Sequence, residues 1–517
     1  MHNLARLVRN SCCLYSLSCD IALPAILTIC CGLTSAQSVS AELLAGAAKI
    51  DITRDEAGPV NGRLHARALV IRNDQITVAF VTVDAVAIGE IGHIDDQFLV
   101  TVRKYAHEKL GISPDGIMVN ASHCHGVPCR DVDQRTIQAI TQAVKNLEPV
   151  QVGTGRGHED RISANRRLKL KNGREIDVRH AYSMPADSDV AGVGPIDPEV
   201  GILRLDRMNG TTLAVVYNFA CHPIQGVPGG ENTADITGFS SEVIEDNLDT
   251  GTVALFVQGC AGDINPAFYK DVNLPRDAVP LGNMLGLSTL KAARTVTCGS
   301  DDRLQVLNDV IQLPRADYAD RIAIIEEEQQ TLMESLTGTT LNFKTFLPLA
   351  VKYHLSDDFP SYYSHRYLHE EQLDRPHLAK MDANNRLAMQ KYLKNVQVME
   401  QLTRVRTNLR LLKRHQQQML NAGRRTLDVE LVAVRVGEFV MLTFPGELTV
   451  QIGMNLKERS PHPNTFIAGY TNGYIYYAPT AEQLLNVGGA QEDSDCLLAP
   501  EWQDIFETHA IEMLRRL

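Results

Sequence analysis

The sequence predicts a mixed α/β domain (α+β mixed) with layered β-sheets and a long helical insertion. Short apolar strands alternate with helical stretches from about residue 45 to residue 310, residues 316–424 show a helical spacing of apolar side chains, and strands return at 427–444. Because the predicted strands are joined both by tight turns and by helices, we expect antiparallel and parallel pairs in the same domain.

Two β-hairpins are predicted in the first part of this domain. Residues 66–88 contain two apolar runs joined at Asn73-Asp74, and residues 201–220 contain two runs joined at Asn209-Gly210. Such residue pairs favour tight turns between antiparallel strands. The other elements expected here are a helix near 95–110, a strand at 116–122 and a buried strand at 253–259.

The insertion at 316–424 contains two helical patterns. The second, from Met389 to Leu412, could belong to a helix of about 40 residues, which would be roughly 60 Å long. We expect its apolar stripe to pack on the α/β domain, and a lid over the substrate is the alternative role. After the strands at 427–444, an amphipathic helix is expected at about 500–517.

The composition of the 517-residue chain is that of a globular protein, with 44% hydrophobic and 22% charged residues. Fifty Lys and Arg residues against 62 Asp and Glu residues give a formal net charge of −12. An acidic chain with no basic block and 6% aromatic residues excludes nucleic acid as the main partner. No pattern in the sequence indicates a protein partner.

Residues 1–41 have the pattern of a signal peptide, with positive charges followed by the apolar stretch 21–35 and by small residues. Cleavage is expected after Ala36 or Ala41, which predicts a secreted or periplasmic protein. Two alternatives are a misassigned start without export, because Asp20 interrupts the pattern, and lipid attachment at one of the paired cysteines at 30–31.

Six cysteines lie beyond residue 41, an even number that would permit disulfides in an exported protein. A domain of this size does not need them, and we expect most to act as small buried apolar side chains. The six are Cys124, Cys129, Cys221, Cys260, Cys298 and Cys496.

Five polar motifs follow predicted strands, which is where open α/β sheets place their sites. They are ASHCHGVPC (121–129), NFACHP (218–223), QGCAGDINP (258–266), FPGE (444–447) and GYTNGYIYYAPT (469–480).

Histidines supply the strongest signal in these motifs. In an extended chain His123 and His125 would point to the same side, so they could share a metal, or one could bind it while the other transfers protons. A pair of hydrogen-bonded histidines in a turn is the alternative. His222 precedes Pro223, which would end the strand and fix the imidazole at its rim.

Oxygen ligands come from the remaining motifs. Glu447 follows a Pro-Gly turn and is expected to start a helix, where its charge would be stabilised; a helix-terminal Glu without a partner is the alternative. Asp263 and Asn265 add polar groups, whereas the tyrosines at 474–477 are expected to pack on the surface. Zinc takes three or four N, O or S ligands from separate elements, so the set predicts a zinc site at the strand ends.

In order and spacing, these motifs together with AKIDIT (48–53) resemble the neutral/alkaline, non-lysosomal ceramidase family. The resemblance covers most of residues 45–515 and implies a ceramidase-like catalytic domain at 42–517 that includes the insertion at 316–424. It implies a Zn²⁺ ion held by His123, His222, Glu447 and Tyr474, with Tyr477 as the alternative tyrosine. It also implies that His125 and Arg166 line the site near the scissile amide.

The sequence departs from the family at several positions. Asn265 stands where ceramidases have an active-site Ser, Cys124 and Gly126 replace a Thr and a Ser beside the histidines, and the resemblance does not extend to the family's C-terminal immunoglobulin-like domain. The zinc chemistry is therefore better supported than the lipid substrate.

The expected function is a secreted zinc-dependent hydrolase that cleaves the N-acyl amide bond of a ceramide-like lipid or a small molecule by attack of zinc-bound water. His125 would transfer protons, and Tyr474 and Asn265 would stabilise the oxyanion. Peripheral contact with a membrane surface is compatible with such a substrate.

Three alternative functions follow from the same residues. The substrate could be an ester or a non-lipid amide such as an acylated sugar, or the chain could be a non-catalytic ceramidase-like binding protein. An amidohydrolase barrel also has a His-X-His after a strand, but its eight strand–helix repeats are missing from the sequence.

Overall fold

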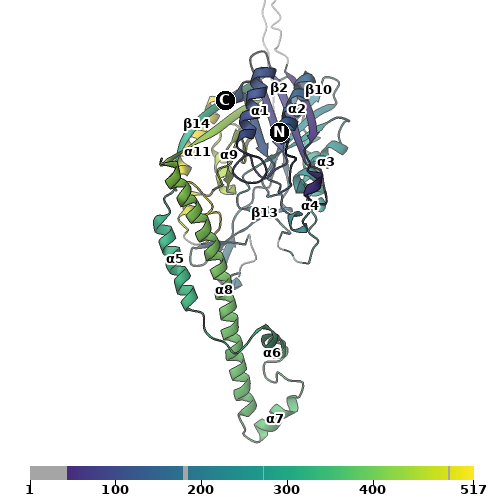
Figure 1. The fold of residues 1–517 in the computed structure, drawn as a ribbon. Helices are drawn as coiled ribbons and strands as arrows, with labels where there is room; N and C mark the ends of the chain where they lie inside the picture. Colours follow the sequence, from purple (N-terminus) through teal and green to yellow (C-terminus); the bar gives the residue numbers. More distant parts are fainter. Residues whose placement is uncertain (1–42, 179–183, 270, 272, 487–488) are drawn as a thin grey trace, which may run out of the picture. The chain divides into compact units, whose positions relative to one another are not determined.

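The structure is a computed structural model, and it describes residues 43–178, 184–269, 271, 273–486 and 489–517 (Figure 1). The signal peptide expected at 1–41 lies outside the described residues. Among those described, no helix has the length and hydropathy needed to cross a bilayer.

The larger sheet has eight strands in the order β12-β11-β10-β5-β1-β2-β3-β4. Its two parallel pairs, β3·β4 and β11·β12, coexist with antiparallel neighbours, as the sequence predicts, and both expected hairpins are present as β2·β3 and β10·β11. The strands are β1 Leu44–Asp51, β2 His65–Arg72, β3 Thr77–Val83, β4 Ile117–Ala121, β5 Glu148–His158, β10 Glu199–Arg207, β11 Thr212–Phe219 and β12 Val253–Gln258.

A second sheet of four strands packs on the larger one. Its order is β14-β15-β16-β18, and β16 pairs with β18 in parallel. Buried side chains of both sheets, among them Leu69, Leu203, Val434 and Phe466, form one continuous core, so the two sheets are packed face to face. The strands are β14 Leu304–Pro314, β15 Thr426–Val436, β16 Phe439–Thr443 and β18 Thr465–Ala468.

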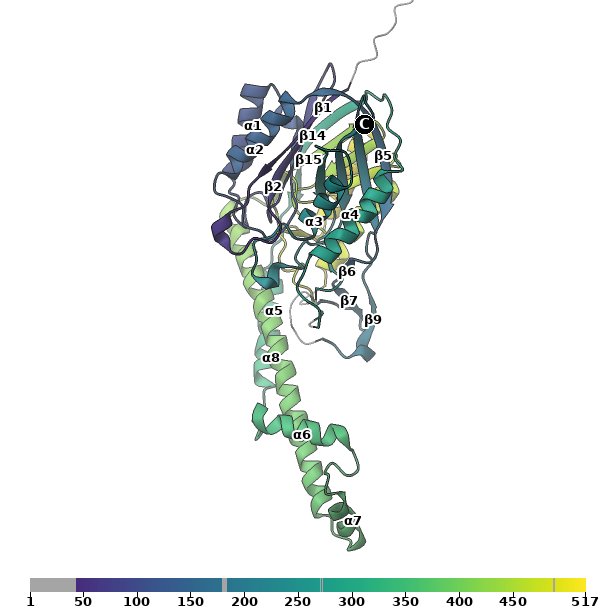
Figure 2. The same cartoon turned by 90° about the vertical axis from the view of Figure 1, so that its right-hand side faces the viewer.

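Helices cover the outer faces of both sheets. Figure 2 shows α1 and α2 against one part of the larger sheet and α3 and α4 against another, while α9 and α11 pack on the smaller sheet. The architecture is therefore a four-layer α/β/β/α arrangement. The helices are α1 Gln97–Leu110, α2 Val132–Lys145, α3 Asp235–Asp246, α4 Val279–Ala293, α9 Val450–Arg459 and α11 Trp502–Arg516.

The remaining elements are short. They comprise the strands β6 Ser163–Asn165, β7 Arg167–Leu170, β8 Glu175–Asp177, β9 Val190–Val193, β13 Ile264–Pro266, β17 Glu447–Leu448 and β19 Tyr477–Ala478, the helix α10 Ala481–Leu484, and the 3₁₀ turns Asp55–Ala57, Pro114–Gly116, Asp187–Asp189 and Val227–Gly229.

Residues 319–422 form the helices α5 Ala319–Glu334, α6 Phe343–Leu355, α7 Ser364–Gln372 and α8 His377–Ala422. Near the C-terminal end of α8, Val405, Leu409 and Leu412 are buried in a cluster with Ile325 of α5 and with Tyr318. Farther from that end, Leu387 is 57% exposed and Met399 55%. The expectation that the whole apolar stripe packs on the α/β domain is therefore wrong for the earlier part of α8, because its neighbours there are α5, α6 and α7 (Figure 1).

The six cysteines at 124–496 are free thiols, and five of them are buried. This confirms their expected role as small apolar side chains. Burial raises the pKa of Cys129 to about 11, so this thiol stays protonated and unreactive at neutral pH.

Gly201 of β10 tests the packing between the two sheets. A Cβ atom built on Gly201 would lie 2.2 Å from a ring carbon of Phe466 in β18, so Gly201→Ala should force the sheets apart. We expect a loss of about 1–3 kcal/mol in the free energy of unfolding, measured by urea denaturation. The matched control is Gly192→Ala in β9, where a Cβ meets nothing within 4 Å; equal losses for the two variants would contradict this packing.

Candidate metal centre

The five predicted motifs each follow a strand, and buried contacts bring these strand ends together. β4, β11 and β12 of the larger sheet and β16 and β18 of the smaller one each run directly into a motif. His123 follows β4, His222 follows β11 and Glu447 follows β16, so three separate strand ends bring these side chains to one place.

Buried side-chain amides join these strand ends beneath the histidines. Asn120 at the end of β4 donates to the Gly469 carbonyl at 2.7 Å and accepts from the Gln258 backbone N–H at 2.9 Å. Asn218 of β11 donates to carbonyls of both sheets, at Val257 (3.0 Å) and Ile467 (3.1 Å). Because these buried amides are hydrogen-bonded, they fix the positions of the strand ends relative to one another.

His123 is buried, with a left-handed backbone at φ 65°, whereas His125 is exposed. The expectation that an extended chain sends both side chains to the same side is therefore wrong, because the backbone turns at the first histidine. The two rings nevertheless stay close, with centroids 5.6 Å apart. His125 thus lies at the solvent side of the cluster, next to the buried imidazole.

The imidazoles of His123 and His222 face the same oxygen of Glu447. The Nε2 atoms of His123 and His222 lie 3.6 Å and 3.2 Å from Glu447 Oε2, and all three side chains are buried. Their ligand atoms lie within 4.8 Å of one another. The donors of a tetrahedral zinc site are about 3.3 Å apart, since each bond is about 2.0–2.1 Å long; the spacing fits such an ion.

The hydrogen bonds of the two rings indicate the same chemistry. His123 Nδ1 contacts the Val86 carbonyl at 2.6 Å, and His222 Nδ1 contacts the Ile264 carbonyl at 3.0 Å. Because a carbonyl can only accept, Nδ1 carries the proton, and Nε2 of a neutral ring presents a lone pair. Burial lowers the pKa of His123 to about 4, so this ring is neutral at pH 7. Two nitrogen lone pairs and a carboxylate repel one another, and a cation bound between them removes this repulsion.

Glu447 is held as a carboxylate by its neighbours. Tyr470 donates to Oε2 at 3.1 Å and Tyr474 donates to Oε1. Burial opposes ionisation, but the adjacent His123 and His222 rings and the hydrogen bond from Tyr474 outweigh it and hold the pKa of Glu447 well below its usual range. Glu447 does not start a helix as expected: it lies in β17, and α9 begins at Val450, so the tyrosines and imidazoles stabilise the charge instead of a helix terminus.

The tyrosines that follow β18 are buried, contrary to the expected packing on the surface. Tyr474 and Tyr477 are 6% and 2% exposed, because their loop runs back into the domain and Tyr477 begins β19 beside β17. The Tyr474 hydroxyl lies on Glu447, and the Tyr477 hydroxyl accepts from Arg166 Nη2 at 3.3 Å.

Arg166, which directly follows β6, and Asn265 of β13 form a second buried polar group. Arg166 Nη1 donates to Asn265 Oδ1 at 2.9 Å, and its Nε donates to Glu492 at 2.6 Å. The Arg166 guanidinium also lies 5.6 Å from the Tyr477 ring centroid. The arginine thereby fixes the Asn265 amide, with the carbonyl oxygen towards Arg166 and the NH₂ group at the other end.

Three site components escape the sequence analysis: Tyr470, Glu492 and Asp493. Glu492 and Asp493 are fully buried and pair with Arg166 and Arg167, with Asp493 bidentate to Arg167 at 2.8 and 3.0 Å. In the sequence, the acidic run 491–495 has the composition of a solvated loop. The consecutive arginines at 166–167, which are its partners in the structure, are the one signal in the sequence that could have indicated a buried charge cluster.

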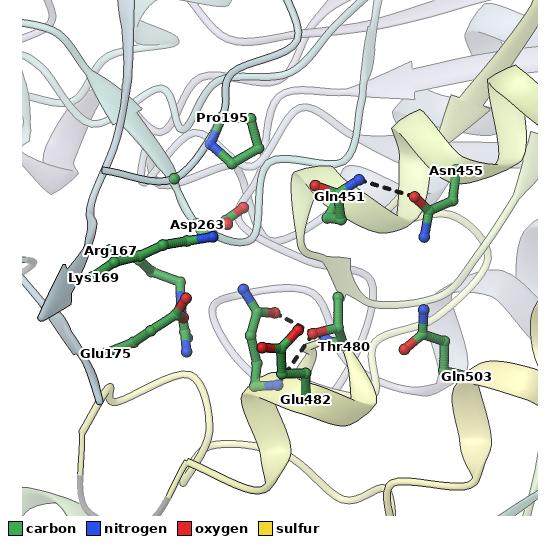
Figure 3. Close-up of a pocket in the computed structure, with 12 residues that line it drawn as sticks. Arg167, Lys169, Glu175, Pro195, Asp263, Gln451, Asn455, Thr480, Glu482 and Gln503 are labelled. Atoms are coloured by element: carbon green, nitrogen blue, oxygen red, sulfur yellow. Dashed lines mark hydrogen bonds and ion pairs between the residues drawn. The ribbon is translucent and has the colours of Figure 1, made fainter. Parts of the chain in front are cut away.

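A polar pocket of about 270 Å³ adjoins this arginine pair (Figure 3). Arg167 and Asp263 line one side, and amides from α9 and α11, including Gln451 and Gln503, line another. Within the described residues its walls do not include His123, His222 or Glu447, so the pocket is separate from the metal cluster.

Comparison with known proteins gives matches in structure alone. No protein-family model matches the chain, and a search of curated proteins finds no significant match. Among solved structures, the neutral ceramidase from Pseudomonas aeruginosa superposes with a TM-score of 0.57 at 17% identity, over 92% of this chain and 75% of that one. A ceramidase complexed with C2 gives 0.58 at 15% identity, over 92% and 76%.

The chain therefore has the mixed α/β fold of the neutral ceramidases. In this chain the strand ends carry a His-His-Glu cluster. This confirms the predicted fold class and the resemblance to the neutral ceramidases at the level of the fold.

Proposed function

We propose that the protein is a secreted, zinc-dependent hydrolase of N-acyl amide bonds, with a ceramide-like lipid as substrate. The observation that carries the proposal is the pair of Nε2 lone pairs from His123 and His222 facing Glu447 Oε2 at a strand edge of a ceramidase fold. The signal-peptide pattern at 1–41 supports export, and the likeness to two ceramidase structures supports a ceramide-like substrate.

His123, His222 and Glu447 would hold the ion, with Tyr474 as the fourth ligand. A bound zinc ion supplies Lewis acidity, which activates water and polarises the scissile carbonyl. His125, exposed beside the His123 ring, accepts a proton from the nucleophile and returns it to the leaving amine. Arg166 orients Asn265 so that the amide N–H can donate to the developing oxyanion.

Purified protein should contain about one zinc per chain by elemental analysis, and a chelator should abolish amide hydrolysis reversibly. Fatty-acid release from N-acyl sphingosine, from an acyl ester and from an N-acyl sugar compares the substrate classes on one preparation. Faster release from the ester or the sugar would overturn the ceramide-like substrate. Bound zinc with no turnover of any of the three would favour the binding protein.

A further inference from the structure

The tip of the helical insertion, which we define as α6 and Tyr362-Tyr363, exposes an apolar ridge. Phe343, Leu347, Val351 and Leu355 follow one another at intervals of four residues, so they share one face of α6. They are 64%, 49%, 53% and 80% exposed. Contiguous exposed apolar surface of this kind marks an interaction site in a folded protein.

The opposite face of α6 holds the ridge in this orientation. Tyr353 is buried against α8, where its hydroxyl donates to Asp382 at 2.5 Å and accepts from Asn385 at 2.9 Å. Phe346 stacks on Tyr392 of α8 with ring centroids 4.8 Å apart. The hydrogen-bonded face of α6 is thus directed inward, and its apolar face is left outside.

The charges of α6 favour a lipid surface as the occupant. The helix itself carries Lys344 and Lys352 and no Asp or Glu, so it is a basic amphipathic helix, and the acidic residues Asp357 and Asp358 lie beyond its C-terminal end. Lysine stems beside an apolar ridge can extend their ammonium groups to lipid headgroups. Tyr362 and Tyr363, which are 88% and 48% exposed, are residues enriched where a membrane meets water.

A second copy of the chain fits the ridge less well. The 13-residue helix is about 20 Å long and about 10 Å wide, so its face offers roughly 200 Å². A stable protein interface needs about 800 Å² from each partner.

We infer that the tip docks on an anionic lipid surface, with the ridge inserted among the acyl chains and the lysines at the headgroups. The inference deepens the proposed function, since it supplies access to a lipid substrate. Helix α8 of the insertion is connected to the site: His415 of α8 contacts Asp495 at 2.8 Å, and the Asp495 carbonyl accepts from Tyr477 N–H at 3.1 Å.

Tryptophan fluorescence of the full chain tests docking without any need for turnover. The only tryptophan is Trp502, which is fully buried, so Leu355→Trp adds a local reporter. Its emission should shift to the blue on vesicles of phosphatidylcholine with phosphatidylglycerol, and brominated acyl chains should quench it. The matched control is Met208→Trp, 59% exposed in the β10–β11 turn, and it should not respond.

Two further double variants separate the contribution of the apolar ridge to vesicle binding from that of the lysines. In the Leu355→Trp background, Leu347→Glu with Val351→Glu should lower vesicle affinity about 100-fold, because two apolar side chains can no longer enter the bilayer. Lys344→Glu with Lys352→Glu should weaken binding to anionic vesicles and leave binding to pure phosphatidylcholine unchanged.

Equal responses at residues 355 and 208, or a shift that depends on protein concentration without vesicles, would overturn lipid docking; the latter would indicate self-association. Hydrolysis of a water-soluble short-chain N-acyl substrate should be unaffected by the tip variants. If no variant hydrolyses this substrate, the result would count against the proposed function but not against lipid docking, since vesicle binding is measured independently.

Discussion

Replacing His222 by alanine should release the bound zinc and abolish hydrolysis. The imidazole supplies one of the three converging donors, and an alanine side chain has no donor atom to take its place. Removing groups that only orient a ligand costs 10–100-fold in metal affinity. Loss of the ligand itself should cost more than about 100-fold, measured by competition with a chromogenic chelator.

Stability provides a readout of this change that does not depend on activity. A ligand that binds only the folded chain stabilises it by about 4 kcal/mol at 1,000 times its Kd. Zinc should therefore raise the melting temperature of the metal-depleted parent chain and leave that of His222→Ala unchanged. His462→Ala is the matched control, because the His462 imidazole bonds to the Leu514 carbonyl at 2.8 Å and not to a proposed zinc ligand. Full zinc content in His222→Ala would refute the ligand assignment.

The fold follows from the sequence wherever local pattern decides the element. The turn at Asn209-Gly210 and the apolar runs on either side of it define β10 and β11 to within two residues. The division of the strands between two facing sheets depends on contacts between distant segments, such as β16 with β18. No local periodicity encodes such a pairing, so the four-layer arrangement could not be predicted.

The same distinction applies to the site. The sequence identifies His123, His222 and Glu447 because their residue types suit a metal, whereas the left-handed backbone at His123 invalidates the argument from strand alternation. Glu492 could not be predicted as a site residue, because its carboxylate is buried against the Arg166 guanidinium, which comes from a distant part of the chain.

The second large effect is expected at His125, with a smaller one at Asn265. General acid–base catalysis by a histidine contributes about 10²–10⁴-fold, so His125→Ala should lower kcat by several orders of magnitude while zinc stays bound. One oxyanion donor contributes about 10²–10³-fold, so Asn265→Ala should keep measurable turnover. Stopped assays of fatty-acid release, with zinc content measured on the same samples, compare the two variants.

Asn265 also decides whether the reaction passes through an acyl-enzyme. An amide nitrogen is not a nucleophile, so no acyl group can be transferred to residue 265, and serine-directed phosphonates should have no effect. Asn265→Asp is the matched variant, since its carboxylate still accepts from Arg166 Nη1 but offers no N–H to the oxyanion. If donation by the amide matters, Asn265→Asp should be at least as impaired as Asn265→Ala. Full activity of Asn265→Asp would refute donation by the amide. An acyl adduct trapped on any side chain would refute direct attack by water.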